Sequence, residues 1–272
     1  MSKGSEFRGL HEQEGAFIIP NPWDVGTARI LASLGFKALA TTSAGMAFSL
    51  GVGDGGVSRE DVLAHCRALV AATDLPVSAD LEKGFGDNPE SAAETVRAAA
   101  ATGLAGCSLE DFTGDRNDPI FPFALAVERI AAAVEAKRGL AGDFVLTARC
   151  ENLIRGRDDL DDTIARLQAY GAAGADVLYA PGLRDLETIR MVCATVDKPV
   201  NVLAGLPGMN FGLDEMAAAG VKRISVGGLL ARVSFGAFIA AAQTMAEQGS
   251  FAFAKDAIGS AKIEALLGAT TR

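Results

Sequence analysis

Short apolar runs alternate with longer, alanine-rich stretches along the whole chain. The alanine-rich stretches end at a glycine, and an apolar run follows within a few residues, as in Leu31–Gly35 before Lys37–Thr42. A glycine just past a helix is a frequent C-terminal stop, and helices that alternate with strands at this spacing indicate βαβ units and a parallel sheet. The apolar runs predict strands at 16–19, 38–42, 76–79, 106–109, 144–149, 177–180, 199–202 and 223–226.

Between these strands the pattern predicts helices at 25–34, 59–72, 89–101, 123–137, 160–170, 186–195 and 212–219. Eight βα units in about 250 residues match the size of a TIM barrel. An open doubly wound sheet is the alternative, but it would normally carry a GxGxxG or GxxxxGK(S/T) fingerprint, and the chain has neither. Because no Pro/Ser-rich linker interrupts the pattern, we predict an α/β protein with one (βα)8-barrel domain over residues 1–272.

Residues 229–272 form a predicted helical extension after the last strand, with helices at 229–248 and 256–267. That is more helix than one barrel position needs. Composition alone leaves two arrangements open, since these helices could pack on their own barrel or on a neighbouring subunit.

Charge and composition narrow the classes of partner. The 272 residues include 25 Lys and Arg against 34 Asp and Glu, so the net charge is −9, which disfavours nucleic acid and anionic membrane surfaces. We expect no membrane span, because no apolar run approaches the roughly 20 residues required, and Met1–Phe7 contains no apolar signal core. Four cysteines without CxxC or CxxH spacing argue against a zinc site or a disulfide framework, which predicts a cytoplasmic protein.

Two carboxylates follow the third predicted strand. The apolar run Leu75–Ala79 leads into Asp80 and Glu82, and a Gly84-Phe85-Gly86 turn comes next. Residues two apart in a strand point to the same side, so both acids are predicted to face one hard cation such as Mg2+. For this motif alone, a solvated strand end with two exposed acids is an equally good interpretation.

Polar residues follow three other strands, which favours a site. Glu110 and Asp111 follow the fourth strand, Arg149 and Glu151 close the fifth, and Asp54 lies in a glycine-rich loop after the second. Active sites of TIM barrels lie at this end of the strands. The turn Thr42-Ser43-Ala44-Gly45 offers hydroxyl and N–H groups for an anion, although it could be an ordinary polar turn. Arg149 either binds an anionic substrate or neutralises the acids.

Residue types that are scarce exclude other chemistry. The two histidines, His11 and His65, do not follow a predicted strand, which disfavours a Ser-His-Asp or Cys-His mechanism. Cys66 and Cys193 fall in predicted helices, and Cys150 alternates with its charged neighbours and should face the helix layer. We therefore expect no nucleophilic cysteine.

Taken together, these motifs resemble the isocitrate lyase/phosphoenolpyruvate mutase superfamily. The resemblance runs from about residue 21 to the C-terminal helices, and its carriers are Asn21-Pro-Trp-Asp24 with Ala28-Arg29, Thr42-Ser-Ala-Gly45, Gly53-Asp54, Asp80-Leu-Glu-Lys-Gly-Phe-Gly86, Leu109-Glu-Asp111 and Ala148-Arg149. It implies a barrel that depends on Mg2+ (or Mn2+) and acts on 2-oxo or 2-hydroxy acids or phosphonates through a pyruvate-like enolate. It also implies that terminal helices exchange between subunits of a homodimer or homotetramer.

The same resemblance implies residue roles. Asp80 would be the direct metal ligand, with Asp54, Glu82 and Glu110 holding metal-bound water. The substrate would be bound by Thr42, Ser43, Ala44 and Arg149. The implied catalytic set is Arg149, Asp54 and Asn117, the last of these in a lid over residues 112–122 that we expect to be mobile and to close over ligand.

Two segments depart from the family's lyase branch. In place of a lid with a Lys-Lys/Arg-Cys-Gly-His motif, the chain has the shorter Asp111–Pro122 segment, which contains no cysteine. Tyr179-Ala-Pro-Gly182 stands where lyases tend to carry a glutamate after the sixth strand. We therefore predict a divergent carbon–carbon lyase or phosphonomutase/hydrolase that does not cleave isocitrate or methylisocitrate. The alternative is a barrel that binds a 2-oxo acid without turnover.

Overall fold

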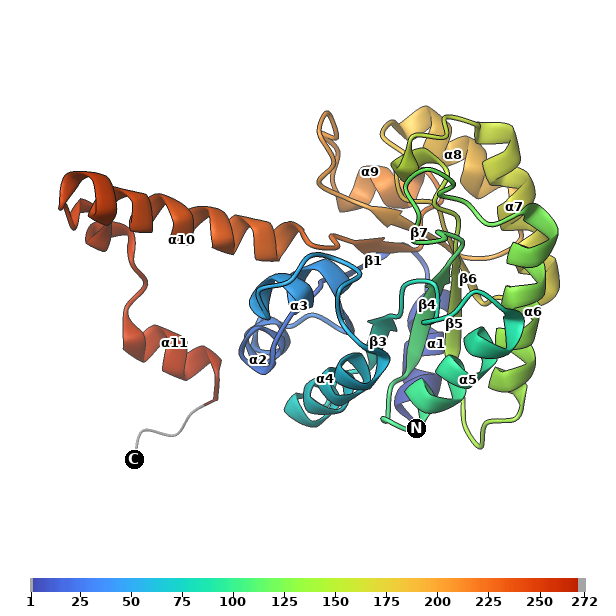
Figure 1. Ribbon diagram of the computed structural model, residues 1–272, viewed down its shortest axis with the longest axis horizontal. Coiled ribbons are helices and arrows are strands. Elements are labelled where there is room, and N and C mark those ends of the chain that lie inside the picture. Colours follow the sequence, from blue (N-terminus) through green and yellow to red (C-terminus); the bar gives the residue numbers. More distant parts are fainter. Residues whose placement is uncertain (1, 269–272) are drawn as a thin grey trace.

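Eight parallel strands form the barrel in the computed structural model, which describes residues 2–268 (Figure 1). Each lies at a predicted position: β1 (Phe17–Ile19), β2 (Leu39–Ala40), β3 (Val77–Asp80), β4 (Gly106–Glu110), β5 (Val145–Arg149), β6 (Val177–Tyr179), β7 (Val200–Leu203) and β8 (Arg223–Ser225). The hydrogen-bonded order is β1-β8-β7-β6-β5-β4-β3-β2. The predicted (βα)8 barrel is therefore confirmed.

The seven predicted helices are also present. They are α2 (Val25–Ser33), α4 (Arg59–Ala72), α5 (Pro89–Ala100), α6 (Phe123–Arg138), α7 (Leu160–Ala173), α8 (Leu186–Thr195) and α9 (Leu213–Ala218). Several begin at a side-chain cap, as at Asp24, whose carboxylate accepts a hydrogen bond from the Thr27 N–H of α2. Asn88 caps α5 in the same way, with a proline at the first helical position.

Three helical segments that precede the last strand were not predicted. They are α1 (Lys3–Glu12), α3 (Ser43–Ser49) and the 3-10 turn η1 (Leu153–Arg155). Helix α1 closes the N-terminal end of the barrel, where Phe7 is fully buried among residues from the starts of the strands. His11, on the same helix, is buried and stacks edge-on against Phe7 and Phe17.

One buried side chain bridges the seam between β1 and β2. The strands meet where the Ala40 N–H donates to the Pro20 carbonyl at 3.0 Å. Asn21 Nδ2 donates to the Thr41 carbonyl, and its Oδ1 accepts from the N–H groups of Val226 and Gly227 after β8. A single amide thus ties together the segments that follow β1, β2 and β8 at the mouth of the barrel.

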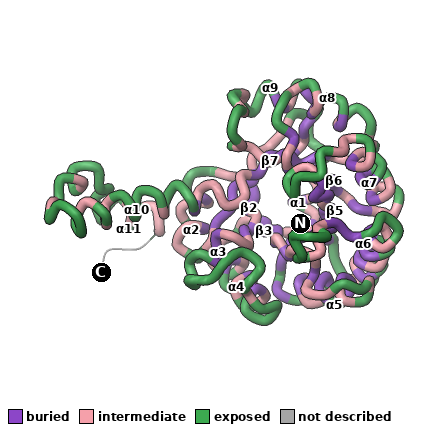
Figure 2. Tube along the Cα trace, turned by 45° about the horizontal axis from the view of Figure 1, so that its top comes forward, coloured by how far each residue is buried: buried purple, intermediate pink, exposed green. Residues whose placement is uncertain are grey.

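The C-terminal extension projects away from the barrel as α10 (Leu229–Gln248), η2 (Ala252–Asp256) and α11 (Ser260–Leu266) (Figures 1 and 2). Residues 269–272 of the predicted extension lie outside the described residues. Helix α10 has 20 residues, and its most apolar 18-residue window has a mean hydropathy of 1.4 with 6% of it buried. The expectation that no run is long and apolar enough to span a membrane is therefore wrong for α10, because its charges lie near its ends. After η2 the chain turns back, and α11 contacts α2.

Candidate active site

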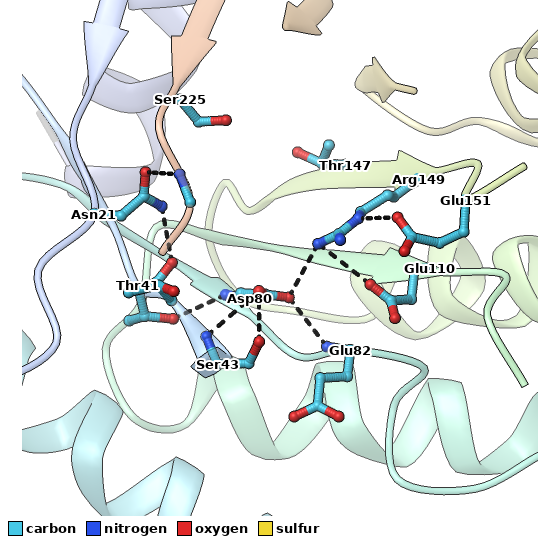
Figure 3. Close-up of polar contacts among 12 residues, drawn as sticks. Asn21, Thr41, Ser43, Asp80, Glu82, Glu110, Thr147, Arg149, Glu151 and Ser225 are labelled. Atoms are coloured by element: carbon cyan, nitrogen blue, oxygen red, sulfur yellow. Dashed lines mark hydrogen bonds and ion pairs between the residues drawn. The ribbon is translucent and has the colours of Figure 1, made fainter. Parts of the chain in front are cut away.

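The predicted acids and arginine meet at the C-terminal ends of neighbouring strands. Asp80 ends β3, Glu110 ends β4 and Arg149 ends β5, with Glu110 directly opposite Arg149 in the register. Figure 3 shows the three side chains pointing toward one another. A cavity of about 860 Å³ opens over this group, and its lining includes Ser43, Asp54, Glu82, Glu110 and Arg149.

Arg149 is the centre of the ion-pair network. Its Nη1 lies 3.2 Å from Glu110 and 3.6 Å from Asp80, while its Nε donates to Glu151. Burial opposes the charge, but the carboxylates Glu110, Glu151 and Asp80 raise the pKa of Arg149 well above its usual value. Arg149 is therefore a fixed cation at the base of the cavity, and its ring of acids holds the guanidinium in one orientation.

Arg155, on η1, is a second cation that sequence reasoning missed. Its Nε donates to Glu151 at 2.9 Å and its Nη2 lies 3.7 Å from Glu110, while its guanidinium stacks on Phe112 at 3.6 Å from the ring centre. It also lines the cavity. The signal was the four-residue spacing from Glu151 to Arg155, which brings the two side chains together in a helical turn.

Ser43 links the second βα segment to Asp80. The Ser43 hydroxyl donates to Asp80 Oδ2 at 3.2 Å, and its N–H points to the same oxygen at 3.5 Å. Thr42 is the buried N-cap of α3, where its hydroxyl accepts from the Gly45 N–H. The predicted Thr-Ser-Ala-Gly turn is thus the start of a helix, and the N–H of Ala44 lies in its first turn, where backbone donors lack intrahelical acceptors.

Gly45 is required by close packing. A Cβ atom at this position would lie 2.7 Å from the Thr42 side chain, 2.9 Å from Trp23 and 3.3 Å from Ala231 at the start of α10. The first turn of α3 is therefore wedged between the segment after β1 and the helix after β8.

Glu82 reaches the cavity by a different route from the one predicted. Strand β3 ends at Asp80, and Glu82 adopts a left-handed backbone with φ of 50°, as does Phe85 with φ of 59°. Strand alternation is therefore not what brings Asp80 and Glu82 together, because the chain has already left the sheet. Left-handed non-glycine residues cost energy and cluster at functional sites.

Two acids that line the cavity, Asp54 and Glu82, have no ion pair among the described residues. Arg149 and Arg155 pair with Glu110 and Glu151, whereas Asp54 is exposed and Glu82 lies beside Gly55 of the same glycine-rich loop. Burial, with the nearby charges of Asp80 and Asp54, raises the pKa of Glu82 to about 7. Burial likewise raises the pKa of Glu110 well above its usual value.

This charge distribution fits a divalent cation between Asp54, Asp80 and Glu82, because Asp80 shares Arg149 with Glu110 and the other two acids have no ion pair in the described part of the chain, so the three carboxylates repel one another. Within residues 2–268, no three Asp, Glu, His or Cys side chains converge as direct ligands of one ion. A cation here would therefore contact mainly water and few protein atoms, which is the usual coordination of Mg2+.

The lid segment is anchored at both ends. Phe112 pairs with Ile120 across an antiparallel bridge, and the Thr113 carbonyl accepts from Lys83 Nζ at 2.6 Å. Arg116 lines the cavity. Asn117 is exposed and donates to the Asp115 carboxylate, and it is not among the residues that line the cavity. The structure thus brings Ser43, Asp54, Asp80, Glu82, Glu110 and Arg149 together at the mouth. Asn117 lies outside the cavity lining, the Thr42 hydroxyl caps α3, and Ala44 has only its backbone N–H to offer.

Asp111 faces the opposite side of β4 from Glu110. It is buried among the helices, where it accepts from Tyr170 Oη at 2.6 Å, the Glu151 N–H at 2.7 Å and Arg166 Nη1 at 3.2 Å. Burial still raises the pKa of Asp111, with Tyr170, Glu151 and Arg166 opposing that shift. Asp111 therefore ties α7 to the sheet and does not reach the cavity.

Known proteins share both the fold and much of the sequence of this chain. The phosphoenolpyruvate phosphomutase family model matches residues 7–246. The 2-methylisocitrate lyase of Escherichia coli (strain K12) is 32% identical over 232 residues, which cover 81% of this chain and 76% of the relative. Among solved structures, a lyase/mutase candidate from Burkholderia cenocepacia J2315 is 57% identical with a TM-score of 0.94, over 97% of this chain and 94% of that one.

A more distant structure carries a ligand. Oxaloacetate acetylhydrolase in complex with its product oxalate is 26% identical with a TM-score of 0.87, over 98% of this chain and 94% of that one. The resemblance that the sequence motifs indicated is therefore confirmed at the level of the family. The chain belongs to the phosphoenolpyruvate phosphomutase family, within the PEP mutase/isocitrate lyase superfamily of enzymes.

Proposed function

We propose that the protein is a Mg2+-dependent enzyme that cleaves or rearranges a C–C or P–C bond of a small 2-oxo or 2-hydroxy acid or phosphonate through a pyruvate-like enolate. The observation that carries this proposal is the charge layout of the cavity. A fixed guanidinium, Arg149, lies at the base of the cavity, and two acids that line the same cavity, Asp54 and Glu82, have no ion pair among the described residues. Such a site can bind a metal ion and an anionic substrate side by side.

Different residues of the chain bind the substrate and the metal ion in this proposal. Arg149 binds and orients the carboxylate or enolate oxygen of the substrate, because its position is fixed by Glu110 and Glu151. Ser43, whose hydroxyl and N–H point to Asp80, and the N–H of Ala44 would donate to the same anion from the start of α3 once a metal ion engages Asp80. Asp80 would hold the metal ion, and Asp54, Glu82 and Glu110 would accept hydrogen bonds from metal-bound water. A bound Mg2+ would supply positive charge where the enolate develops.

A substrate panel tests the proposal. Purified protein with Mg2+ is offered 2-oxo and 2-hydroxy diacids and phosphonates, and release of pyruvate or of a second oxo acid is followed. We expect turnover of at least one compound that EDTA abolishes and added Mg2+ restores. Tight binding of oxalate with no turnover of any compound would favour the alternative, a barrel that binds 2-oxo acids without chemistry.

The lid, residues 112–122, affects which compounds the protein can turn over. Its polar residues, including Arg116 and Asn117, could close over ligand, but none of them is a thiol that could protonate a lyase product. We therefore expect isocitrate and 2-methylisocitrate to be poor substrates, in contrast to the 2-methylisocitrate lyase relatives. Robust glyoxylate formation from isocitrate would contradict this expectation.

We also propose that α10 and α11 pack on a second copy of the chain, in a homodimer or homotetramer. Phe238 is 68% exposed and Val233 62% exposed, which is unusual for large apolar side chains on one helix. A membrane is the less suitable partner, because α11 returns to contact α2 and a spanning helix would separate the two. The protein would then act in the cytoplasm, where its four free cysteines stay reduced.

Light scattering tests the assembly. We expect a mass that is a multiple of 28.0 kDa at micromolar concentration. The double variant Phe238→Glu/Ile239→Glu should lower that mass, because buried carboxylates oppose an apolar contact. A wild-type monomer, or binding to neutral lipid vesicles that the double variant loses, would reject the proposal.

A further inference from the structure

The interior of the barrel below the mouth is unusually polar. Interiors of TIM barrels are filled mainly by branched aliphatic side chains. Here the buried interior positions include Ser78, Thr147, Asn201, Arg223 and Ser225. They lie between the apolar floor around Phe7 and the ring formed by Asp80 and Arg149.

A cavity of about 50 Å³ lies within this polar layer. Its lining includes Arg223, Asn201, Ser225 and Ser78 below and Asp80 with Arg149 above. A buried water needs roughly 10–15 Å³ of such space, so the cavity has room for a few waters or for one small polyatomic ion.

Arg223 is a buried cation without an acidic partner. Its Nε donates to Asn201 Oδ1 at 2.9 Å and its Nη2 donates to Thr147 Oγ1 at 2.9 Å, while its Nη1 lies 3.4 Å from His11 Nε2. All three partners are neutral groups. Among the described residues no carboxylate lies within ion-pair distance of it, whereas Arg149 has three such partners.

His11 cannot supply the missing negative charge, and it does not add a second positive one. Its Nδ1 lies 2.8 Å from the Phe7 carbonyl, so that nitrogen carries the proton and Nε2 accepts from Arg223. Burial, followed by the charge of Arg223, lowers the pKa of His11 to about 3. The ring is therefore neutral at physiological pH.

Donors around the cavity remain for a ligand. Each terminal nitrogen of Arg223 carries a second N–H beyond the contacts above. Ser225 Oγ accepts from Asn201 Nδ2 at 2.9 Å, and its own hydroxyl proton can turn from the neighbouring Tyr179 to a ligand in the cavity. A buried charge that is not paired is costly, and burial lowers the pKa of Arg223 to about 10. A small anion would supply the missing partner.

We propose that this cavity is an anion subsite in which Arg223 and Ser225, oriented by Asn201, bind one carboxylate-sized monoanion beneath the candidate active site. The chemistry allows two sources. The anion is either a free ion such as formate or chloride, or a second carboxylate of the substrate that extends down past Arg149. The second source rests on the proposed function, and the first does not.

Thermal unfolding at constant ionic strength separates the sources, with the bulky anion gluconate as the background. If the occupant is a free ion, formate should raise the Tm of the wild type saturably, by about 5 °C at roughly a hundred-fold excess over its Kd. The Arg223→Met variant should lose this rise. The matched control Arg97→Met removes an exposed arginine that pairs with Glu90, and it should keep the rise.

If the occupant is a substrate carboxylate, formate should have no effect that depends on Arg223. With Mg2+ present, a four-carbon 2-oxo diacid should then bind more tightly than oxalate, by about ten-fold, as expected for one added charge-assisted contact. Arg223→Met should remove that advantage and leave oxalate affinity unchanged. Oxalate binding that depends on Mg2+ and Asp80 but not on Arg223 would keep the proposed function intact while this inference fails.

A measurement on the wild type does not depend on the folding of a variant. Crystals soaked in bromide should show an anomalous peak inside the barrel beside Arg223. If the occupant is a substrate carboxylate, adding a diacid should remove that peak. Bromide peaks confined to the surface, together with no Arg223-dependent effect of formate or of the diacid, would overturn the inference. Ser225→Ala supplies a milder variant, which should weaken the anion effect without abolishing it.

Discussion

Glu110 and Asp111 are neighbours in sequence, and they occupy opposite environments on the two sides of β4. Asp111 faces the helices and accepts three hydrogen bonds, from a tyrosine, a backbone N–H and an arginine. Glu110 faces the mouth, where it has ion pairs with Arg149 and Arg155 at 3.2 and 3.7 Å. The difference teaches that an acid whose partners all lie among the helices serves the fold, whereas an acid that pairs with arginines lining a cavity can exchange those partners for a ligand.

The largest expected effect concerns Asp111, the acid that serves the fold. Asp111→Ala should lower the free energy of unfolding by about 3–5 kcal/mol, because it removes the buried acceptor of three donors, the Tyr170 hydroxyl, the Glu151 N–H and Arg166 Nη1. Urea unfolding measures the change. The control is Asp54→Ala, which removes an exposed acid at the cavity and should leave stability within about 0.5 kcal/mol of the wild type. Equal effects of the two substitutions would remove the distinction drawn between them.

The next effect concerns the ligand-binding side. Arg149→Lys should weaken oxalate binding in the presence of Mg2+ by about 2 kcal/mol, because a bidentate fork is replaced by a point charge. Isothermal titration calorimetry measures the affinity. Arg157→Lys, on an exposed arginine that pairs with Asp159 and Asp162, is the matched control and should change nothing. Unchanged oxalate affinity in Arg149→Lys would make Arg149 a structural residue like Arg166.

The smallest effect sharpens the comparison through pH. The pKa of Glu82 is about 7 in the folded protein, against an ordinary value of 4.5. Between these values the folded state holds a proton that the unfolded state has released, so stability falls as pH rises through this window. In EDTA at pH 8, Glu82→Gln should therefore be more stable than the wild type by about 1 kcal/mol, a figure reduced for partial exposure to solvent.

At pH 4 the carboxyl group of Glu82 is mainly protonated in both the folded and the unfolded state. The stability advantage of Glu82→Gln should therefore vanish at that pH. Added Mg2+ should narrow the difference at pH 8, because a cation relieves the repulsion that raises the pKa of Glu82. Parallel thermal melts at the two pH values, with and without Mg2+, give all four comparisons. A constant offset between variant and wild type at both pH values would indicate a packing effect and not a charge effect.

The sequence predicted the barrel well because its signals are local and repeated. Each apolar run of four to six residues and each glycine after a helix indicates one βα unit. Eight such units in sequence are typical of one common architecture, the TIM barrel. It missed α1, whose polar stretch has no clear apolar face, although Phe7 alone fills the bottom of the barrel. It also took the start of α3 for a turn, because Thr42-Ser-Ala-Gly45 is as typical of a loop as of an N-cap.

The site was predictable in part. The acids at strand ends were visible, since strand ends follow from the pattern. The direction in which each acidic side chain points was harder to predict. Glu82 reaches the cavity through a left-handed backbone that no alternation rule describes, and Arg155 enters from a 3-10 turn after β5. Arg223 was read as the first residue of an ordinary strand, because its burial depends on contacts with residues far away in sequence, such as Thr147 and His11.

The measurement that tests the central claim most directly is calorimetric titration of oxalate into the wild type and Asp80→Ala, each with and without Mg2+. Oxalate presents two adjacent anionic oxygens, as a pyruvate enolate does. If the mouth binds a metal ion and a 2-oxo acid together, oxalate should bind the wild type tightly only with Mg2+. Asp80→Ala should lose that binding while its unfolding temperature without ligands stays close to the wild-type value. Oxalate binding that is independent of Mg2+, or that survives in Asp80→Ala, would contradict the account.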